Sequence, residues 1–354
     1  MHPIVFVSPF SNTENPYIAR QQELLRGLGC EVRPLSLGSL VKGRCWGLAS
    51  PRNVVLVHWL ENRLFKKGRA QRRPSVTGAA QFCAYVTTLV IARARVVYVV
   101  HDHDVHDVQD SWRWLSTRAI RLLRRVADSR VVHDPSFAEL YDATYLPHPL
   151  YEEPTTSPPV SSHGVPRFAA MGAIRPYKCL DAVLESWPPD APLLIAGTGD
   201  PAYMARLREI VSRRGLEGAV TIDDRFLSDD EFFATLGRQD VLLLPHRAGA
   251  NLVSGAFFAG VGHVRLVLAR RTPFIAWAQQ HVPGIESFTD DAEIGPVVRR
   301  LVDEWASTRE VDLTPQAVAA FGESACREAY GTFLGLPAHG ASRVAADASH
   351  EERI

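Results

Sequence analysis

The sequence predicts an α/β protein with two doubly wound, Rossmann-like parallel-sheet domains that face a cleft. Three observations lead to this prediction. Short apolar runs alternate with helical patterns in both halves of the chain, which is typical of parallel sheets. A stretch rich in proline, serine and threonine separates the halves at 151–166. A chain of 354 residues is also long for a single core and sufficient for two.

The composition excludes several classes of protein. Apolar residues make up 46% and charged residues 22%, as in soluble globular proteins. Acidic and basic residues balance at 39 each, so we expect no nucleic-acid partner held by bulk charge. The five cysteines contain no CxxC pair and predict reduced thiols in a cytoplasmic protein. We find neither a signal-peptide pattern at the start nor an apolar run of transmembrane length.

The pattern of apolar residues in the first half, residues 1–150, predicts one α/β domain. Its sequence gives apolar runs for strands and 3.6-residue periodicity for helices. The first expected helix stops at Gly29. The expected strands are Pro3–Ser8, Cys30–Leu35, Asn53–Val57, Val96–Val100 and Arg130–His133, and the expected helices are Tyr17–Leu28, Val76–Ala94 and Asp110–Ala127, with a further helix capped by Asp134.

The second half predicts another α/β domain at 167–312, after the linker at 151–166. Residues 313–335 form an expected C-terminal helix, with its pattern at Pro315–Phe333, and 336–354 a flexible tail. The expected elements are a strand from Phe168, the strands Pro192–Ala196, Val220–Ile222, Asp240–Leu244 and Phe274–Ala276, and the helices Ala202–Arg214, Asp229–Leu236 and Glu293–Glu304.

Two turns in the stretch Phe168–Pro201 are the centre of the functional prediction. The first carries Arg175 and Lys178 directly after a strand, and the second begins with Gly197 after the next strand. In open α/β sheets, ligands sit at the carboxyl ends of strands. Both turns could therefore face one anionic ligand, with Gly172 and Gly197 letting backbone approach it. The alternatives are ordinary strand-to-helix turns and two solvated cations.

Several short motifs resemble the retaining, GT-B-fold members of glycosyltransferase family 4, in particular a bacterial surface-polysaccharide subgroup. Each motif is weak alone, but their order and spacing agree over roughly 168–277. The matching segments of the second half are Met171–Lys178, Leu194–Gly199, Asp224–Phe232, Gln239–Pro245 and Arg271–Ala276, and those of the first half are Asn15–Tyr17, His58–Glu61, Val100–Asp102 and Pro147–His148.

The resemblance implies a nucleotide-diphosphate sugar as co-substrate, no other cofactor, no metal, and transfer with retention at the anomeric carbon. The second domain would bind the donor, and the first a glycan or polyprenyl-diphosphate-linked acceptor of bacterial exopolysaccharide or cell-surface glycan synthesis. The C-terminal helix at 313–335 would cross back toward the first domain.

The resemblance also implies three catalytic residues, which are His101, Arg175 and Lys178. Lys178 stands at the family's phosphate-contacting lysine, and His101 beside the donor sugar. Arg175 is shifted from the family's usual arginine position, where this chain has Ala173. Physically, negative charge builds on the leaving diphosphate, and preorganised cations stabilise it.

The remaining donor residues are less regular. Arg225 and Phe226 stand where the family frames the nucleobase by backbone contacts. The segment Pro245–Leu268 contains no acidic residue, whereas many family members carry two glutamates there. In this chain Asn251, Ser254 and Gly255 could begin a helix whose N–H groups hold the diphosphate.

On the acceptor side we expect Asn12, Tyr17, Trp59 and Glu61, which lie at strand ends of the first domain. Trp59 could stack on a sugar or pack in the core. The acidic and histidine-rich run 102–107 suits a polar sugar and acceptor pocket, a solvated loop, or a divalent metal held through Asp102 and Asp104.

Two basic segments of the first domain, Arg63–Arg73 and Arg113–Arg125, could contact an anionic membrane. The alternative is a solvated basic face. We therefore expect a cytoplasmic protein, either free or at the inner face of the cell membrane. Two rival functions are a non-catalytic nucleotide-sugar-binding scaffold on the same fold and a GT-B-fold sugar-nucleotide epimerase.

Overall fold

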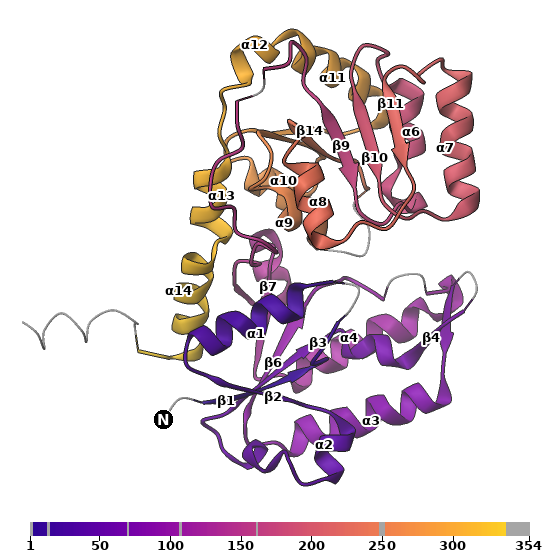
Figure 1. The fold of residues 1–354 in the computed structure, drawn as a ribbon. Coiled ribbons are helices and arrows are strands. Elements are labelled where there is room, and N and C mark those ends of the chain that lie inside the picture. Colours follow the sequence, from indigo (N-terminus) through magenta and orange to yellow (C-terminus); the bar gives the residue numbers. More distant parts are fainter. Residues whose placement is uncertain are drawn as a thin grey trace, which may run out of the picture. The chain divides into compact units, whose positions relative to one another are not determined.

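A computed structural model describes residues 3–12, 15–68, 71–105, 108–160, 162–247 and 252–337 (Figure 1). The chain divides into two compact units. Unit 1 comprises Met1–His133, Phe137–Pro149 and Glu323–Ile354, and unit 2 comprises Asp134–Ser136 and Leu150–Gly322. Among the described residues, no helix is long and apolar enough to cross a membrane.

Unit 1 contains a six-stranded parallel sheet in the order β2-β1-β3-β6-β7-β8. Strand β2 pairs with one side of β1, and the next strand of the sheet, β3, pairs with the other side. The strand order thus reverses between β1 and β3, as in a doubly wound fold. The strands are β1 (Ile4–Ser8), β2 (Glu31–Pro34), β3 (Val54–His58), β6 (Arg95–Val100), β7 (Ser129–Val132) and β8 (Thr144–Tyr145).

The helices of unit 1 include one from the far end of the chain. Helix α14 (Glu323–Leu334) packs on α1 (Tyr17–Gly27), where Gln21 Nε2 donates to Tyr330 Oη at 3.1 Å. The basic run predicted at 63–73 contains a small antiparallel hairpin of β4 (Phe65–Lys67) and β5 (Arg72–Pro74). The other helices are α2 (Leu37–Val41), α3 (Val76–Ile91), α4 (Arg113–Val126) and α5 (Ala138–Tyr141).

Unit 2 contains a second six-stranded parallel sheet in the order β11-β10-β9-β12-β13-β14, with two strands on one side of its first strand, β9, where unit 1 has one. The reversal here falls between β9 and β12. The predicted pair of doubly wound parallel sheets is therefore confirmed. The strands are β9 (Phe168–Met171), β10 (Leu193–Ala196), β11 (Val220–Asp223), β12 (Val241–Leu244), β13 (Leu266–Arg270) and β14 (Ile285–Phe288).

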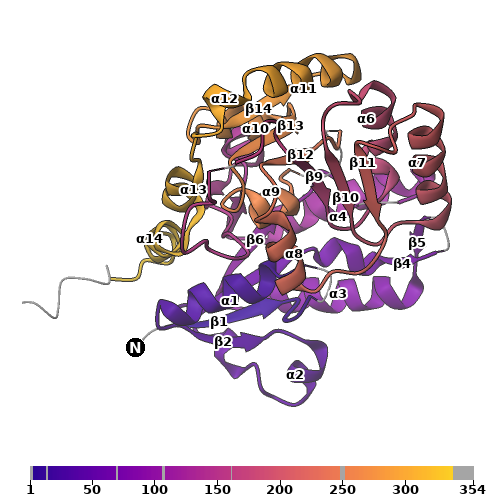
Figure 2. The ribbon, with the colours of Figure 1, turned by 45° about the horizontal axis from the view of Figure 1, so that its top comes forward.

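Alternation along β9 gives the unit 2 sheet two apolar faces. Phe168 and Ala170 belong to one buried cluster, and Ala169 and Met171 to the other. The first cluster includes buried residues of α6 (Leu180–Ser186), α7 (Pro201–Arg213) and α11 (Ile294–Asp303). Figure 2 shows α6 and α7 side by side. The second cluster includes α8 (Asp229–Leu236), α9 (Gly255–Gly260), α10 (Pro273–Ala278) and α13 (Thr314–Phe321).

Two sequence predictions for the second half of the chain are wrong. The expected strand Phe274–Ala276 is part of the helix α10, because Thr272 caps its N-terminus by accepting from Ile275 N and Pro273 occupies the first turn. The expected single helix at 315–333 is broken into α13 and α14 at Gly322, whose backbone is extended. A Cβ at Gly322 would lie 2.4 Å from the Val318 carbonyl oxygen.

The proline-rich segment predicted as a linker belongs to unit 2 and is hydrogen-bonded to the rest of that unit at several residues. Tyr151 N donates to Phe258 O at 3.2 Å, and Trp305 Nε1 donates to His163 O at 3.2 Å. The guanidinium of Arg265 donates to the carbonyl oxygens of Pro158 and Pro159. The short helix α12 (Trp305–Thr308) thereby holds the end of the segment.

Candidate functional site

The two turns predicted to share a ligand lie next to each other at the carboxyl edge of the unit 2 sheet. Strands β9 and β10 are paired in parallel, and the pairing continues beyond them. Gly172 N donates to Ala196 O and Ile174 N to Thr198 O, both at 3.0 Å. The two turns are therefore adjacent, and that they face one anionic ligand stays a prediction.

Glycine is required where these turns touch. Gly197 has a φ of +136°, and a Cβ there would lie 2.2 Å from the Gly172 carbonyl oxygen. Gly172 itself has a φ of +89°. Only glycine adopts such backbone readily, and only a missing Cβ permits this approach. The result is a narrow cradle at the ends of two strands, in which Gly172 is half-buried and Gly197 is buried.

Lys178 lies in the first of these turns, at the end of the 3-10 turn Pro176–Lys178. The half-buried side chain folds back, and its Nζ donates to Met171 O at 2.8 Å. Burial lowers the pKa of Lys178 to about 8, so the amine is still mostly protonated at neutral pH. An ammonium has three donors. Met171 uses one, and two remain for a ligand.

Arg175 stands three residues before Lys178 on the same turn. Its side chain is exposed, and its carbonyl oxygen accepts from Lys178 N at 3.0 Å. The structure thus brings both predicted cations onto one turn. Lys178 is fixed at the base of the turn, whereas Arg175 extends into solvent.

A cationic group at the ends of β12 and β13 escaped the sequence analysis. Arg270 is buried, donates through Nε to Pro245 O at 2.9 Å, and pairs with Asp291. Arg247 donates to the same carboxylate at 2.7 Å. Burial opposes ionisation of Asp291, but the bonds from Arg270 and Arg247 hold its pKa below the ordinary value. For Arg247 the signal was present, since it follows the predicted strand Asp240–Leu244, whereas β13, which Arg270 ends, was not predicted as a strand.

His246 is close enough to both Lys178 and Arg270 for their charges to act on it. Burial, followed by the charges of Lys178 and Arg270, lowers the pKa of His246 to about 4. The imidazole is therefore neutral at pH 7. Lys178, Arg247 and Arg270 lie near two carboxylates, Asp291 and Asp181, and Asp181 is also paired with Arg206. Positive charge is therefore in excess, so this edge of unit 2 favours an anion.

Arg225 and Phe226, which were also predicted to bind the donor, differ in their surroundings. Arg225 is held by two carboxylates, at 3.0 Å from Asp223 and 2.7 Å from Glu231. Hydrogen bonds from Ser228 and Arg225 lower the pKa of Glu231 to about 2. The Arg225 guanidinium is therefore bound in a surface network of ion pairs. Only the backbone of Arg225 remains for a ligand. Phe226 is 81% exposed beside it.

The predicted helix start after the acid-free loop is present but short. Helix α9 begins at Gly255, as expected, with Ser254 as the preceding residue. The Ser254 side chain makes no capping hydrogen bond, and the helix has six residues. Asn251, predicted to contribute here, lies outside the described residues.

In unit 1, four buried histidines gather at the carboxyl edge of the sheet. His58 ends β3, His101 follows β6, His133 follows β7, and His148 comes shortly after β8. The ring of Tyr17, at the start of α1, lies among them at centroid distances of 5.5, 5.1, 5.2 and 4.7 Å respectively. We call these four residues the histidine cluster.

Hydrogen bonds fix much of this cluster. Tyr17 Oη is 2.7 Å from His133 Nε2, and His133 Nδ1 is 2.8 Å from Leu146 O. A carbonyl only accepts, so His133 carries its proton on Nδ1 and Tyr17 donates to Nε2. Gln21 in turn donates to Tyr17 Oη at 2.9 Å.

Burial keeps the histidine cluster neutral at pH 7. It lowers the pKa of His58 to about 3 and of His133 to about 4. Burial, with the neighbouring histidines, also holds the pKa values of His101 and His148 well below the ordinary value. Adding a proton would place a charge in a site with little water.

The predicted acceptor residues have different surroundings. Trp59 is half-buried and stacks on His101 at a centroid distance of 4.0 Å. Tyr17 and Glu61 are buried, and Glu61 accepts from Tyr98 Oη at 2.9 Å. Asn12 is half-buried. Contact of these residues with an acceptor stays a prediction, and the two buried ones have clear structural partners.

The run after His101 was also considered as a metal site. Asp102 is buried, and His103 Nδ1 is hydrogen-bonded to Tyr141 Oη. Over the described ranges, no group of three or more His, Cys, Asp or Glu side chains is arranged to hold a metal ion. His106 and Asp107, which belong to this run, lie outside those ranges.

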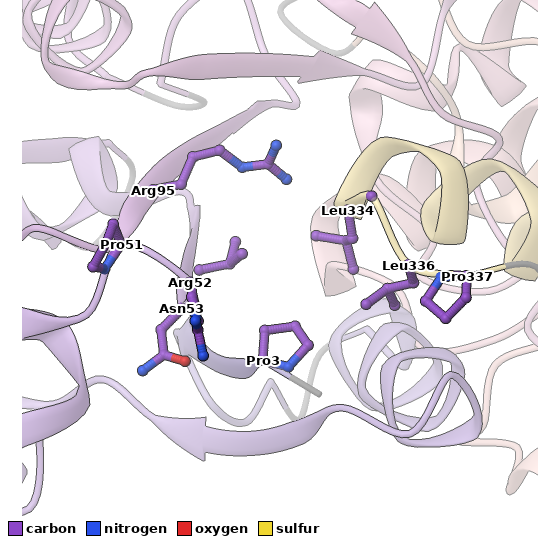
Figure 3. Close-up of a pocket in the computed structure, with 10 residues that line it drawn as sticks. Pro3, Pro51, Arg52, Asn53, Arg95, Leu334, Leu336 and Pro337 are labelled. Carbon is purple, nitrogen blue, oxygen red and sulfur yellow. The ribbon is translucent and has the colours of Figure 1, made fainter. Parts of the chain in front are cut away.

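A cavity of about 470 Å³ lies at the opposite edge of the unit 1 sheet. Figure 3 shows Arg95 and Pro51 on one side of it and Leu334 and Pro337 on the other. The Arg95 guanidinium donates to Phe333 O at 3.0 Å. Because ligands in α/β sheets sit at the carboxyl ends of strands, this amino-end cavity is not the candidate site.

Comparison with known proteins supports the fold. No protein-family model matches the chain, and no curated protein matches its sequence. Among solved structures, HepE of Anabaena in complex with UDP and glucose is 14% identical, with a TM-score of 0.60 over 95% of this chain and 100% of that one.

Two further structures are similar over nearly the same extent. An alpha-glucosyltransferase in complex with UDP and a 13-mer DNA is 12% identical, with a TM-score of 0.59 over 94% of this chain and 99% of that one. AviGT4, a glycosyltransferase involved in avilamycin A biosynthesis, is 15% identical, with a TM-score of 0.56 over 95% and 97%. The chain therefore has the GT-B fold.

Proposed function

We propose that this protein is a metal-independent glycosyltransferase that moves a sugar from a nucleotide-diphosphate donor to an acceptor, with retention at the anomeric carbon. The observation that carries the proposal is the cradle of Gly172 and Gly197 with Lys178 at its base. A fixed ammonium, on the turn that also carries Arg175, supplies the positive charge that a diphosphate requires.

The chemistry of the transfer makes the position of Lys178 important. When the bond to the sugar breaks, negative charge grows on the oxygen of the leaving diphosphate. A cation that is already in place stabilises this charge without reorganisation. Lys178 is held by Met171 O in the free protein. We assign it the β-phosphate contact, with Arg175 as the exposed partner that closes on the ligand.

UDP is the first nucleotide to test. HepE and the alpha-glucosyltransferase were both solved with UDP. In this chain Arg225 and Phe226 would frame the base through their backbone, and Ser254 and Gly255 would face the diphosphate. His101 would donate or accept at the sugar. These roles follow the family resemblance of the sequence.

For the acceptor we propose a glycan or polyprenyl-diphosphate-linked sugar at the inner face of a bacterial membrane, as in exopolysaccharide or cell-surface glycan synthesis. Helix α4 supports a membrane contact because it contains no acidic residue. Its exposed side carries Trp114 and Leu122, which are 50% and 40% exposed. Arginines at positions 113, 118, 121 and 125 are also exposed on this helix. Basic helices with exposed aromatic groups bind anionic lipid surfaces.

A donor panel tests the proposed function. The purified protein is incubated with UDP-, GDP- and ADP-sugars, with and without a lipid-linked acceptor, and products are separated by chromatography. We expect transfer or slow donor hydrolysis with one donor. Binding without turnover of any donor would favour the non-catalytic scaffold, which the acid-free segment 245–268 also suggests. Conversion of the sugar without acceptor would instead identify an epimerase.

A further inference from the structure

His58 and His101 form a buried pair at the carboxyl ends of β3 and β6. His58 is 1% and His101 is 8% exposed, and His58 Nδ1 lies 2.9 Å from His101 Nε2. Trp59 stacks on His101. The ring of His101 is therefore held by two contacts, one in its plane and one on its face. The proposed function uses His101 but gives His58 no task.

Counting protons distinguishes two arrangements of this pair. A neutral imidazole carries one N–H, so one ring donates across the 2.9 Å contact and the other accepts. Within the described residues, His58 Nε2 is buried and has no hydrogen-bond partner. If His101 donates, His58 must carry its proton on Nε2, as a buried N–H without an acceptor.

The other arrangement avoids that orphaned donor. His58 then carries its proton on Nδ1 and donates it to His101 Nε2. Only a lone pair on His58 Nε2 is left unpaired, and buried N–H groups without a partner are rarer than under-used acceptors. His101, which is also neutral, must in consequence carry its own proton on Nδ1.

We propose that His58 is a positioning residue that holds His101 in the tautomer with its proton on Nδ1, so that His101 donates a hydrogen bond to an oxygen of the bound sugar. The assignment of the tautomer stands on the geometry of unit 1 alone. The identity of the acceptor oxygen rests on the proposed function. In this arrangement His101 cannot act as a general base through Nδ1.

The surroundings of the pair reinforce a neutral donor. Tyr17, His133 and His148 face it from α1, from the end of β7 and from the segment after β8. Burial keeps the two histidines neutral at pH 7. Trp59 covers His101 from the loop after β3. Glu61 and Asp102 are the acidic residues nearest in sequence, and Glu61 is engaged by Tyr98. The neutral His101 ring can only donate through Nδ1. It therefore selects an acceptor there, such as a hydroxyl or phosphate oxygen.

The unpaired His58 Nε2 gives the proposal a distinctive signature. Leucine has a similar volume and no polar atom, so His58→Leu removes a poorly satisfied buried group along with the donor to His101. Asparagine places an amide nitrogen near the position of Nδ1, so His58→Asn retains the donor. Residues kept for function at a cost in stability behave in this way.

Nitrogen NMR of the full chain, labelled with ¹⁵N-histidine, tests the tautomer without any substrate. His101→Asn assigns the resonances of His101. We expect the parent and His58→Asn to show a protonated Nδ1 and a bare Nε2 on His101. We expect His58→Leu to show exchange between the two tautomers. A proton on Nε2 of His101 in the parent would overturn the assignment.

Kinetics with the donor found active tests the role. We expect His58→Leu to lower kcat about ten- to hundredfold. We expect an unchanged or higher Tm, while His58→Asn stays near the parent in both. Equal kcat for the leucine variant and the parent would overturn the positioning role, whatever the tautomer. A protein that turns over no donor would defeat the proposed function alone, because the NMR result would still decide the assignment.

Discussion

A Cβ atom at position 197 would lie 2.2 Å from the carbonyl oxygen of Gly172. The two turns that carry the proposed diphosphate site therefore touch through backbone alone. Their contact depends on two glycines that are 25 residues apart in sequence. Gly172 has a φ of +89° and Gly197 one of +136°, so each turn is also in a conformation that disfavours side chains.

Gly197→Ala should disrupt this cradle. The added carbon clashes with backbone, and the φ of +136° is strained for alanine, so we expect a loss of at least about 2 kcal/mol in the free energy of unfolding. Nucleotide binding should be lost even where the protein remains folded. Urea unfolding and calorimetry measure the two effects. Gly218→Ala is the matched control, since nothing lies within 4 Å of its Cβ position.

Nucleotide binding should weaken as pH rises through about 8. The folded protein without ligand holds the pKa of Lys178 near that value because of burial, and a bound diphosphate favours the charged amine. The affinity for UDP should be nearly constant below pH 7.5 and fall toward about tenfold per pH unit above 8.5. Calorimetric titration between pH 7 and 9 checks this. Lys178→Arg stays charged and should lose the pH dependence; a parent with constant affinity would show that Lys178 does not bind.

The histidine cluster should make unit 1 sensitive to acid. The folded-state pKa of His133 is about 4 and that of His58 about 3, both below the ordinary 6.5. The unfolded chain therefore takes up protons first, and stability falls as pH falls from 6.5 to 4. His133 alone contributes about 3 kcal/mol to this loss. Scanning calorimetry from pH 7.5 to 4.5 measures it.

His133→Asn should reduce the proton uptake on unfolding by about one. His281→Asn, at an exposed position in unit 2, is the control and should leave the pH dependence unchanged. Equal slopes for the His133 variant and the parent would mean that the cluster is already accessible to protons in the folded protein.

Charge reversal on α4 should release the protein from anionic vesicles. We expect the double variant Arg118→Glu and Arg121→Glu to bind phosphatidylglycerol vesicles at least about tenfold more weakly, since each basic residue near the surface contributes about 1 kcal/mol. Arg52→Glu with Arg93→Glu changes the net charge equally at other exposed positions of unit 1. Vesicle sedimentation measures both. Equal binding by both double variants would leave α4 a solvated basic helix.

The sequence predicts what is local. Lys178 and Gly197 were found because a strand, a turn and a helix follow one another within a few residues. The same rule failed at Phe274–Ala276, where three apolar residues are too few to distinguish a strand from a helix. The cap at Thr272 and the proline after it were the better signal.

The histidine cluster could not be predicted as a cluster. His58 and His148 are 90 residues apart, and only the strand order β3-β6-β7-β8 brings them to one edge. The pairing of Arg225 with Asp223 and Glu231 was equally invisible, because a pattern gives the position of a charge but not its partner. Arg270 was overlooked because the strand that it ends, β13, was not predicted.

The most direct test of the proposed diphosphate site is the affinity for UDP of the parent and of Lys178→Met, measured by calorimetry at pH 7. Methionine keeps much of the apolar stem and removes the charge. Lys42→Met, at an exposed position of unit 1, is the control. We predict that Lys178→Met weakens binding at least about thirtyfold, because hydrogen bonds to charged groups contribute about 1.5–3 kcal/mol. UDP binding of equal strength in the parent and in Lys178→Met would contradict the site.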